Sequence, residues 1–137
     1  MKLILKTPLL ALLLYSCNCA DDNRTDYDPA AISGSWKLAQ RISGGEITIY
    51  NDNQYKHLRF NTDSTYTSHE TFAGEVHIRT GFYTLQDGEL MMISNDSDTI
   101  RATIAHLNSN TLALQFEHDH DNDGVTDSVR ESYVSQL

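Results

Sequence analysis

The feature that most constrains this chain is an alternation of apolar and polar residues through residues 30–137. Trp36 and Leu38 are spaced in this way, as are the apolar positions between Ile100 and Ile104, whereas the 3-4 spacing of amphipathic helices is almost absent. Successive side chains of a strand point to opposite faces of a sheet, so this pattern predicts half-buried β-strands. We therefore expect an all-β domain in which the apolar half of each alternating pair faces inward.

Short polar and glycine-rich stretches divide this pattern into eight or nine segments of ordinary strand length. Asp87-Gly88 is a two-residue hairpin signal. Gly81 lies inside a longer run and indicates a bulge or a sharp bend. Such short connections favour antiparallel pairing of consecutive strands, and a chain of this size then closes into a barrel or packs as a sandwich. The other turn-forming stretches are 43–45, 51–53, 61–63 and 108–110.

The N-terminus has the layout of a secretion signal. Lys2 and Lys6 precede an apolar run, residues 9–15, which ends in Ser16-Cys17 and is too short to span a bilayer. We expect residues 1–16 to be a signal peptide and residues 17–29, which are polar and acidic, to be a flexible tether. A disulfide between Cys17 and Cys19 is the alternative use of the two cysteines, but it would close almost no loop and stabilise little.

Leu14-Tyr15-Ser16-Cys17 resembles a bacterial lipobox. The resemblance implies cleavage before Cys17 and acylation of this cysteine with palmitate-type chains, and two chains give stable membrane anchoring. The acidic residues Asp21 and Asp22 resemble the export signal that places Bacteroidota lipoproteins on the outer face of the outer membrane. A solvated linker that leaves the protein in the periplasm is the alternative reading of these acids.

Charge and length narrow the range of functions. The chain has 19 acidic and 10 basic residues and a formal charge of −9; removing a leader that carries Lys2 and Lys6 but no acid makes it −11. Such a domain repels phosphate backbones, so we expect no nucleic-acid partner. The stretch 30–137 is long enough for one hydrophobic core and too short for two.

The segment 117–131 carries the sequence's main sign of metal binding. Carboxylates recur at positions 119, 121 and 123, and Gly124 follows them. A calcium ion requires several oxygen ligands in one tight bend, and this spacing provides them. The segment resembles the first nine positions of an EF-hand-type loop, but no helix flanks it and Arg130 occupies the twelfth position. The predicted ligands of a structural calcium ion are Asp119, Asp121, Asp123, the Val125 carbonyl, Asp127 and, one position late, Glu131.

Two alternatives exist for this loop. It can be a solvated acidic hairpin tip that binds nothing, or a transition-metal site, since His118 and His120 lie two residues apart. Oxygen donors outnumber the imidazoles, which favours calcium. Without a bidentate twelfth ligand, we expect a weak site of about 10⁻⁴–10⁻³ M.

Gly34-Ser35-Trp36 resembles the Gly-x-Trp start of lipocalins, and the segments 80–85, 87–90 and 105–114 resemble phrases of lipocalin-like domains in Bacteroidota lipoproteins. This resemblance covers residues 30–137. It implies an antiparallel up-and-down eight-stranded β-barrel, with Trp36 closing one end and a late arginine, for which Arg130 is the candidate, stacked on it. Such a barrel holds one small ligand or is filled by side chains.

No catalytic signature is present: the chain lacks a Gly-x-Ser-x-Gly elbow, a His-Glu-x-x-His motif, a Walker loop and a dinucleotide fingerprint. His69-Glu70 could serve acid–base chemistry, but alternating strands often produce such pairs by chance. We therefore expect a non-enzymatic, lipid-anchored outer-membrane protein that binds a small apolar ligand or an envelope protein. The alternative is a structural or accessory subunit with a filled barrel that contacts a partner protein and binds no ligand.

Overall fold

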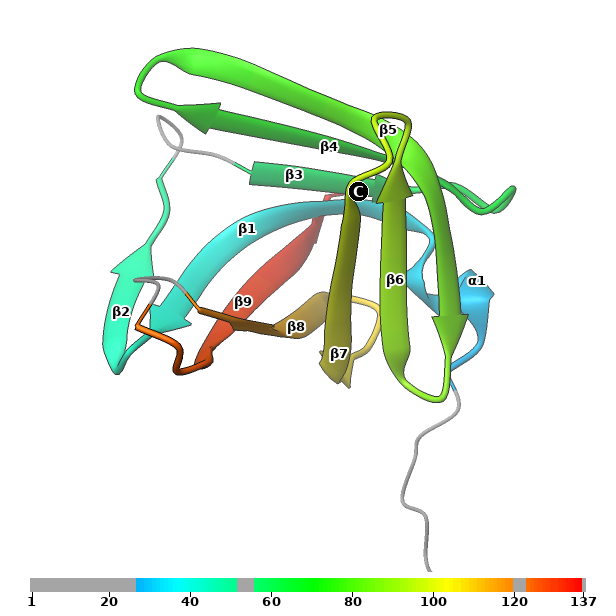
Figure 1. Ribbon diagram of the computed structural model, residues 1–137. Helices are drawn as coiled ribbons and strands as arrows, with labels where there is room; N and C mark the ends of the chain where they lie inside the picture. The colour runs from blue at the N-terminus through cyan, green and yellow to red at the C-terminus, as the bar shows by residue number, and fades with distance from the viewer. Residues whose placement is uncertain (1–26, 52–55, 120–122, 137) are drawn as a thin grey trace, which may run out of the picture.

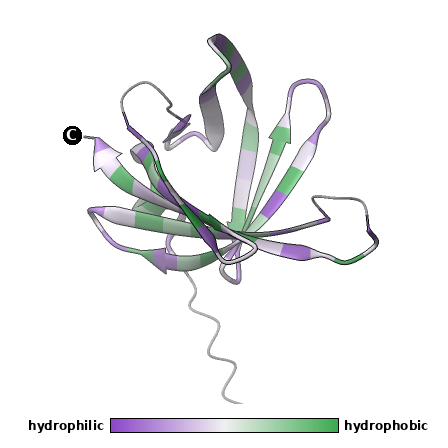
Figure 2. Cartoon of the chain, turned by 90° about the vertical axis from the view of Figure 1, so that its left-hand side faces the viewer, coloured by the Kyte–Doolittle hydropathy of each residue, from purple (hydrophilic) through white to green (hydrophobic). Residues whose placement is uncertain are grey.

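The computed structural model describes residues 27–51, 56–119 and 123–136, and within these ranges it contains one short helix and nine strands (Figure 1). Apolar and polar residues alternate along the strands, as Figure 2 shows. No helix in the described ranges has the length and apolar character needed to cross a bilayer. The elements are α1 (Pro29–Ile32), β1 (Gly34–Ser43), β2 (Glu46–Ile49), β3 (Lys56–Phe60), β4 (Thr65–Phe72), β5 (Glu75–Gln86), β6 (Glu89–Ser94), β7 (Thr99–Leu107), β8 (Thr111–His118) and β9 (Asp127–Gln136).

The strands form one antiparallel sheet that closes on itself. Strands β3 to β9 pair with their neighbours in order, β3 pairs with the first half of β1, and β9 returns to β1. This closing ladder runs from Ser35 opposite Gln136 to Ser43 opposite Val129. The short strand β2 pairs only with the second half of β1. The eight strands other than β2 therefore form the predicted up-and-down barrel, and the all-β class is confirmed.

A β-bulge in β1 changes which side chains face inward. The register of β1 against β9 shifts between Leu38 and Gln40. After the shift Arg41 lies opposite the buried Glu131, and directly opposed residues share a face of the sheet, so Arg41 points inward and Ile42 outward. Strict alternation would place Ile42 on the same face as Leu38, but the extra residue in β1 advances the pattern by one position.

Helix α1 and Trp36 close one end of the barrel. Ile32, the last helical residue, is fully buried, and the Trp36 Nε1–H donates a hydrogen bond of 2.8 Å to its carbonyl oxygen. This bond satisfies the indole of a tryptophan that is only 3% exposed. Gly34 starts β1 with a φ of +138°, a conformation that favours glycine. That Gly34 and Trp36 form a lipocalin-type barrel-end signature stays a prediction.

Arg130, the predicted partner of Trp36, lies elsewhere. Trp36 is opposite Ser135 near the end of β9, whereas Arg130 is opposite Ile42 at the far end of the β1–β9 ladder. Arg130 is also exposed and shares the outward face with Ile42. The stacking prediction is therefore wrong, since the two side chains point to opposite sides of the barrel wall.

The apolar core fills the barrel behind this closed end. Phe60 and Tyr83 meet edge to face, with ring centroids 5.0 Å apart and planes inclined by 73°. The Tyr83 hydroxyl donates a hydrogen bond of 2.9 Å to the carbonyl oxygen of Asn61, so its polar atom is satisfied. The largest fully buried side chains are those of Tyr133, Phe60, Ile32, Leu38, Leu58, Leu90, Leu112 and Leu114.

The long strand β5 bends as it leaves β4 and joins β6 (Figure 1). It pairs with β4 through Phe82 and with β6 from Gly81 onward, so the change of partner occurs at these residues. No register shift interrupts either ladder, so Gly81 marks a bend and not a bulge. A Cβ atom built on Gly81 would lie 1.9 Å from the carbonyl oxygen of Ile93, which means that only glycine fits this close approach of β5 to β6.

The free end of the β4–β5 hairpin does not follow the rule that apolar residues face inward. Val76 and Ile78 are 56% and 59% exposed. Ile78 lies opposite His69 on the outer face, while Arg79 lies opposite Ser68 on the inner face and lines the barrel interior. In this segment the polar residues of the alternating pattern face the interior and the apolar residues face solvent. The prediction of an aliphatic inner wall is therefore wrong here.

Candidate functional site

The barrel interior contains a small cavity that is lined by core residues and by charged side chains. Its volume is about 40 Å³. A cavity needs roughly 10–15 Å³ to hold one water molecule, so this one accommodates a few waters at most. Its walls come from seven strands, β3 to β9, and consist of Lys56, Leu58, Tyr66, Ser68, Glu70, Arg79, Met92, Ile100, Phe116 and Tyr133.

A buried ion pair lies next to this cavity. The carboxylate of Glu131, a residue that is 4% exposed, accepts hydrogen bonds of 2.8 and 3.1 Å from the Lys56 ammonium. The Tyr133 hydroxyl donates a third bond of 2.5 Å to the same carboxylate. The ammonium also lies 5.7 Å from the centroid of the Phe116 ring, a cation–π distance. Glu131 is thus well compensated, as a buried charge must be.

Burial, the charge of Glu131 and the hydrogen bond to Glu131 hold the pKa of Tyr133 well above its ordinary value. Glu70 raises this pKa further, and the opposing effect of Arg41 is smaller. The phenol is therefore protonated throughout the physiological range and remains a hydrogen-bond donor.

Four buried side-chain polar atoms have no hydrogen-bond partner among the described residues: the hydroxyl of Tyr66, Nε of Arg41, Oγ1 of Thr71 and Oδ1 of Asp119. Tyr66 is 2% exposed and lines the cavity. Its pKa is raised chiefly by burial, against a lowering by Arg79, with a further rise from Asp98. A buried hydroxyl of this kind is usually satisfied by an ordered water, and the cavity has room for one.

The predicted calcium loop is only partly within the described residues, because Asp121 lies outside them. The Asp119 carboxylate accepts a hydrogen bond of 3.1 Å from the Gly124 amide, and Asp123 accepts one of 2.7 Å from the Val125 amide. These contacts form a tight acidic turn around the glycine. In the described part of the chain, no three acidic or histidine side chains converge on a point that could hold a metal. Calcium binding by Asp119, Asp121, Asp123, Val125 and Asp127 stays a prediction.

Glu131, the sixth predicted ligand, must be corrected. It is the fifth residue of β9, which begins at Asp127, and it points inward with Val129 and Tyr133. Lys56 and Tyr133 already bind its carboxylate inside the barrel. Strand geometry places it about 13 Å along β9 from Asp127, so it lies too far away to complete the loop.

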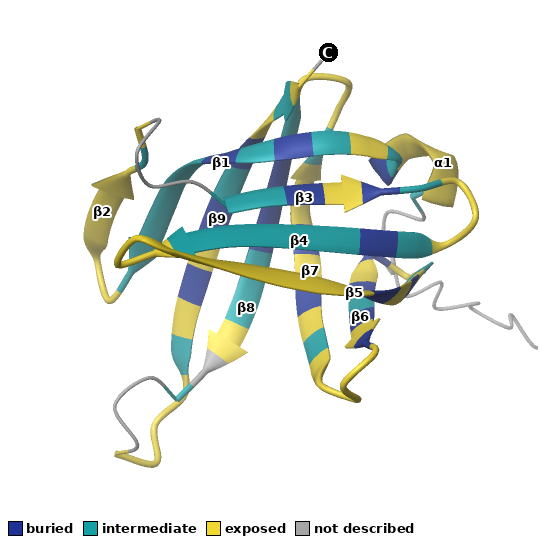
Figure 3. Ribbon diagram, turned by 90° about the horizontal axis from the view of Figure 1, so that it is seen from above, coloured by how far each residue is buried: buried dark blue, intermediate teal, exposed yellow. Residues whose placement is uncertain are grey.

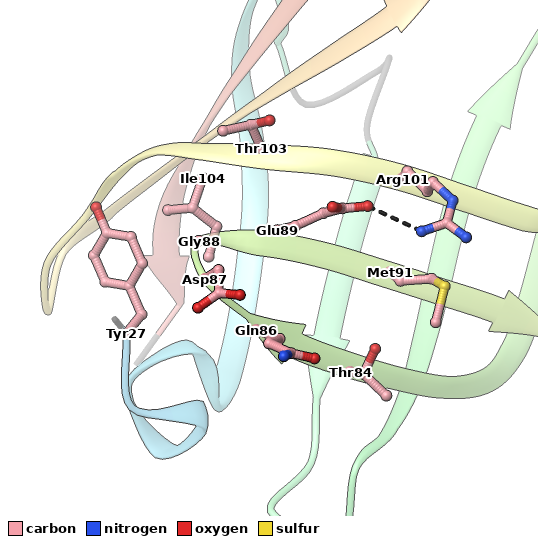
Figure 4. A pocket seen from close by; sticks show the side chains of 10 residues that line it. All are labelled: Tyr27, Thr84, Gln86, Asp87, Gly88, Glu89, Met91, Arg101, Thr103 and Ile104. Carbon is pink, nitrogen blue, oxygen red and sulfur yellow. Dashed lines mark hydrogen bonds and ion pairs between the residues drawn. The ribbon is translucent and has the colours of Figure 1, made fainter. Parts of the chain in front are cut away.

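Larger hollows are present on the outer surface. One of about 610 Å³ lies over the β5–β6 turn and the outer face of β6 and β7, next to Tyr27 (Figure 4). Charges of both signs meet there, and an ion pair of 3.0 Å joins Arg101 to Glu89. A second hollow of about 630 Å³ lies over β1, β3 and β4 and is lined by Ser35, Lys37, His57, Leu58, Arg59, Thr67, His69 and Gln136.

The sequence predictions did not include either the buried ion pair or the second hollow. The alternation of Val129, Glu131 and Tyr133 was the available signal for an inward-facing glutamate. For the hollow there was no such signal, because it depends on which strands are neighbours. His57 and His69, for example, are brought directly opposite each other only by the pairing of β3 with β4.

The geometry defines a class of protein: a closed, up-and-down, eight-stranded β-barrel whose interior is filled by side chains around one small cavity. The lipocalin-like fold is generally a binding fold without enzymatic activity. The chain belongs to the family with the lipocalin-like domain, whose family model matches residues 32–114. No curated protein matches the sequence.

Solved structures agree with this fold. A lipocalin-like protein from Bacteroides uniformis is 14% identical, with a TM-score of 0.58 over 77% of this chain and 99% of that one. An uncharacterised protein from Bacteroides eggerthii is 10% identical, with a TM-score of 0.55 over 76% and 98% of the two chains. A redesigned β-barrel is 8% identical, with a TM-score of 0.56 over 80% and 95%. At these identities the similarity concerns the fold alone.

Proposed function

We propose that this chain is a non-enzymatic lipoprotein of the outer membrane whose filled barrel serves as an accessory domain and contacts a partner through its outer surface. The observation that carries the proposal is the size of the interior cavity, about 40 Å³. Sites for small organic ligands usually measure about 300–1,000 Å³. The interior is thus better suited to side chains and a few waters than to a small apolar ligand.

The chemistry of the cavity supports the same choice. Lys56 and Glu131 form their ion pair at its wall, and Glu70 and Arg79 line it. An apolar ligand placed against these groups would remove water from charges without offering hydrogen bonds in return, which costs free energy. The outer surface, in contrast, provides hollows of about 610 and 630 Å³.

The location rests on the sequence. Leu14-Tyr15-Ser16-Cys17 supports acylation of Cys17, and Asp21 and Asp22 after it support placement on the cell surface. Two acyl chains would hold the barrel at the membrane through the tether 17–29. A partner in the envelope would then meet the domain at high effective concentration, because both are confined to the same surface.

Two experiments test the lipid anchor and the filled interior. Cells grown with a clickable palmitate analogue should yield labelled protein in the membrane fraction, and Cys17→Ser should yield none. The purified protein, titrated with the apolar fluorophore N-phenyl-1-naphthylamine, should show no saturable binding, because the interior has no room for it.

Saturable binding of the fluorophore by the unmodified barrel, competed by fatty acids, would return the protein to the class of small-ligand carriers. Labelling of the Cys17→Ser variant would move the anchor to another residue.

We also propose that the loop at 119–127 binds a structural calcium ion. The carboxylates of Asp119 and Asp123 accept hydrogen bonds from the adjacent amides of Gly124 and Val125, and calcium would offset the repulsion between negative charges in this loop. At a calcium concentration ten times a Kd of about 10⁻³ M, binding contributes about 1.4 kcal/mol, which should raise the melting temperature by about 5 °C relative to chelator. Asp121→Ala and Asp123→Ala should lose this rise, while Asp96→Ala, in another exposed turn, should retain it. Equal melting temperatures of the unmodified protein with calcium and with chelator would exclude the site.

A further inference from the structure

The outer hollow over β1, β3 and β4 is built by two rows of side chains that cross these strands. Lys37, His57 and His69 are directly opposed in one row. Ser35, Arg59 and Thr67 form the adjacent row, two residues further along each strand. The three strands lie side by side in Figure 3. From the spacing of strands and residues, the six side chains occupy an area of about 10 by 7 Å.

All the charge in this hollow is positive. None of its eight lining residues is acidic, although the chain as a whole has a formal charge of −9. Lys37 and Arg59 supply cationic groups, and His57 and His69 supply ring nitrogens. The sheet register has thus concentrated cationic groups in one place on an acidic protein.

Partial burial of these side chains strengthens their electrostatic interaction with a bound anion. The side chains of Lys37, His57 and His69 are half-buried, so the field between them is less screened by water than at a fully exposed site. The hydroxyl groups of Ser35 and Thr67 at the same place are hydrogen-bond donors. Burial, followed by the charges of Lys37 and His69, lowers the pKa of His57, which agrees with a positive field in the hollow.

We infer that this hollow is a binding site for a single tetrahedral oxyanion, a phosphate or sulfate group. The arrangement matches such a group because two fixed cations balance its charge and nitrogen and hydroxyl donors surround its oxygens. An extended polyanion fits less well, since the −9 charge of the whole chain would repel it. This inference rests on the proposed function, which assigns binding to the outer surface. It adds that the group bound there is a phosphate or a sulfate.

Isothermal titration of the purified protein with sodium sulfate, against sodium chloride at matched ionic strength, tests the inference. The unmodified protein should bind sulfate in a saturable way, and Lys37→Gln and Arg59→Gln should each weaken binding about fivefold, the effect of one exposed charge contact. Arg101→Gln removes the same charge from the other side of the barrel and should leave binding unchanged. Repeating the titration with inorganic phosphate and glycerol phosphate distinguishes a free anion from an esterified group.

The pH dependence provides a separate readout. His57 is faced by Lys37 from β1 and by His69 from β4, and Arg59 follows it on its own strand. Protonation of His57 adds positive charge, and its lowered pKa places this step below pH 6.5. Sulfate, whose own charge is constant, should therefore bind about fivefold more tightly at pH 5 than at pH 7. Replacing His57 with glutamine should remove this difference and leave the binding at pH 7.

Absence of saturable sulfate binding, or an equal loss on Arg101→Gln and Arg59→Gln, would overturn the inference. Neither result would alter the outcome of the palmitate and fluorophore experiments, so failure here is distinguishable from failure of the proposed function.

Discussion

Replacing Gly81 with alanine is expected to destabilise the protein by about 3 kcal/mol, the upper end of the usual cost of overpacking. The added Cβ would lie 1.9 Å from the carbonyl oxygen of Ile93 and 2.8 Å from the Cα atom of Ser94. These contacts are with backbone atoms, which cannot rotate away, so β6 itself must shift. The shift would separate β5 from β6 where β5 changes partner, and the free energy of unfolding in urea should fall accordingly.

Gly74→Ala is the matched control for this substitution. Gly74 has a φ of +83°, and an added Cβ meets no atom within 4 Å, so the cost is confined to backbone strain of about 1 kcal/mol. A loss for Gly81→Ala no greater than that for Gly74→Ala would show that the two strands do not approach as closely as described.

Removing the Glu131 carboxylate is the second change with a large expected effect. Glu131→Leu leaves the Lys56 ammonium and the Tyr133 hydroxyl without their shared acceptor. The side chains of Lys56 and Glu131 are only 19% and 5% exposed. Breaking one side of a buried ion pair typically costs about 3–5 kcal/mol, and we expect a loss near the lower value, since Lys56 retains some access to water. Chemical unfolding at neutral pH measures this loss.

A double-mutant cycle distinguishes the pair from simple packing. Lys56→Met combined with Glu131→Leu should recover at least about 1 kcal/mol relative to the sum of the single changes, because no uncompensated charge remains. The same cycle on Arg101 and Glu89, whose ion pair is 3.0 Å long and more than half exposed, should give less than about 0.5 kcal/mol. Additive effects at Lys56 and Glu131 would contradict a coupled buried pair.

Most of the barrel could be predicted from the sequence because the alternation of residues is a local property. Trp36, Leu38 and Leu58 lie in the core for the reason that the pattern gives: each is the apolar member of an alternating pair. The bulge in β1 could not be predicted in this way. No glycine or proline marks the register shift between Leu38 and Gln40, which depends on the pairing with β9.

The candidate sites were harder to predict because they depend on contacts between distant strands. The loop spacing predicts Glu131 as a ligand only if the loop continues to residue 131, but β9 already begins at Asp127. Lys56 and Glu131, 75 residues apart, meet only because the barrel closes. Likewise, the row that contains Lys37 and His69 requires the register of three strands.

The closing ladder between β1 and β9 has a consequence for how the chain reaches its native state. Its register places Ser35 opposite Gln136, so the barrel closes only after the last strand has paired with the first. Contacts between residues this far apart slow folding, because the entropy of a long loop is lost before the contact forms. A chain still emerging from a ribosome or a translocation pore therefore cannot finish folding until its final strand is free.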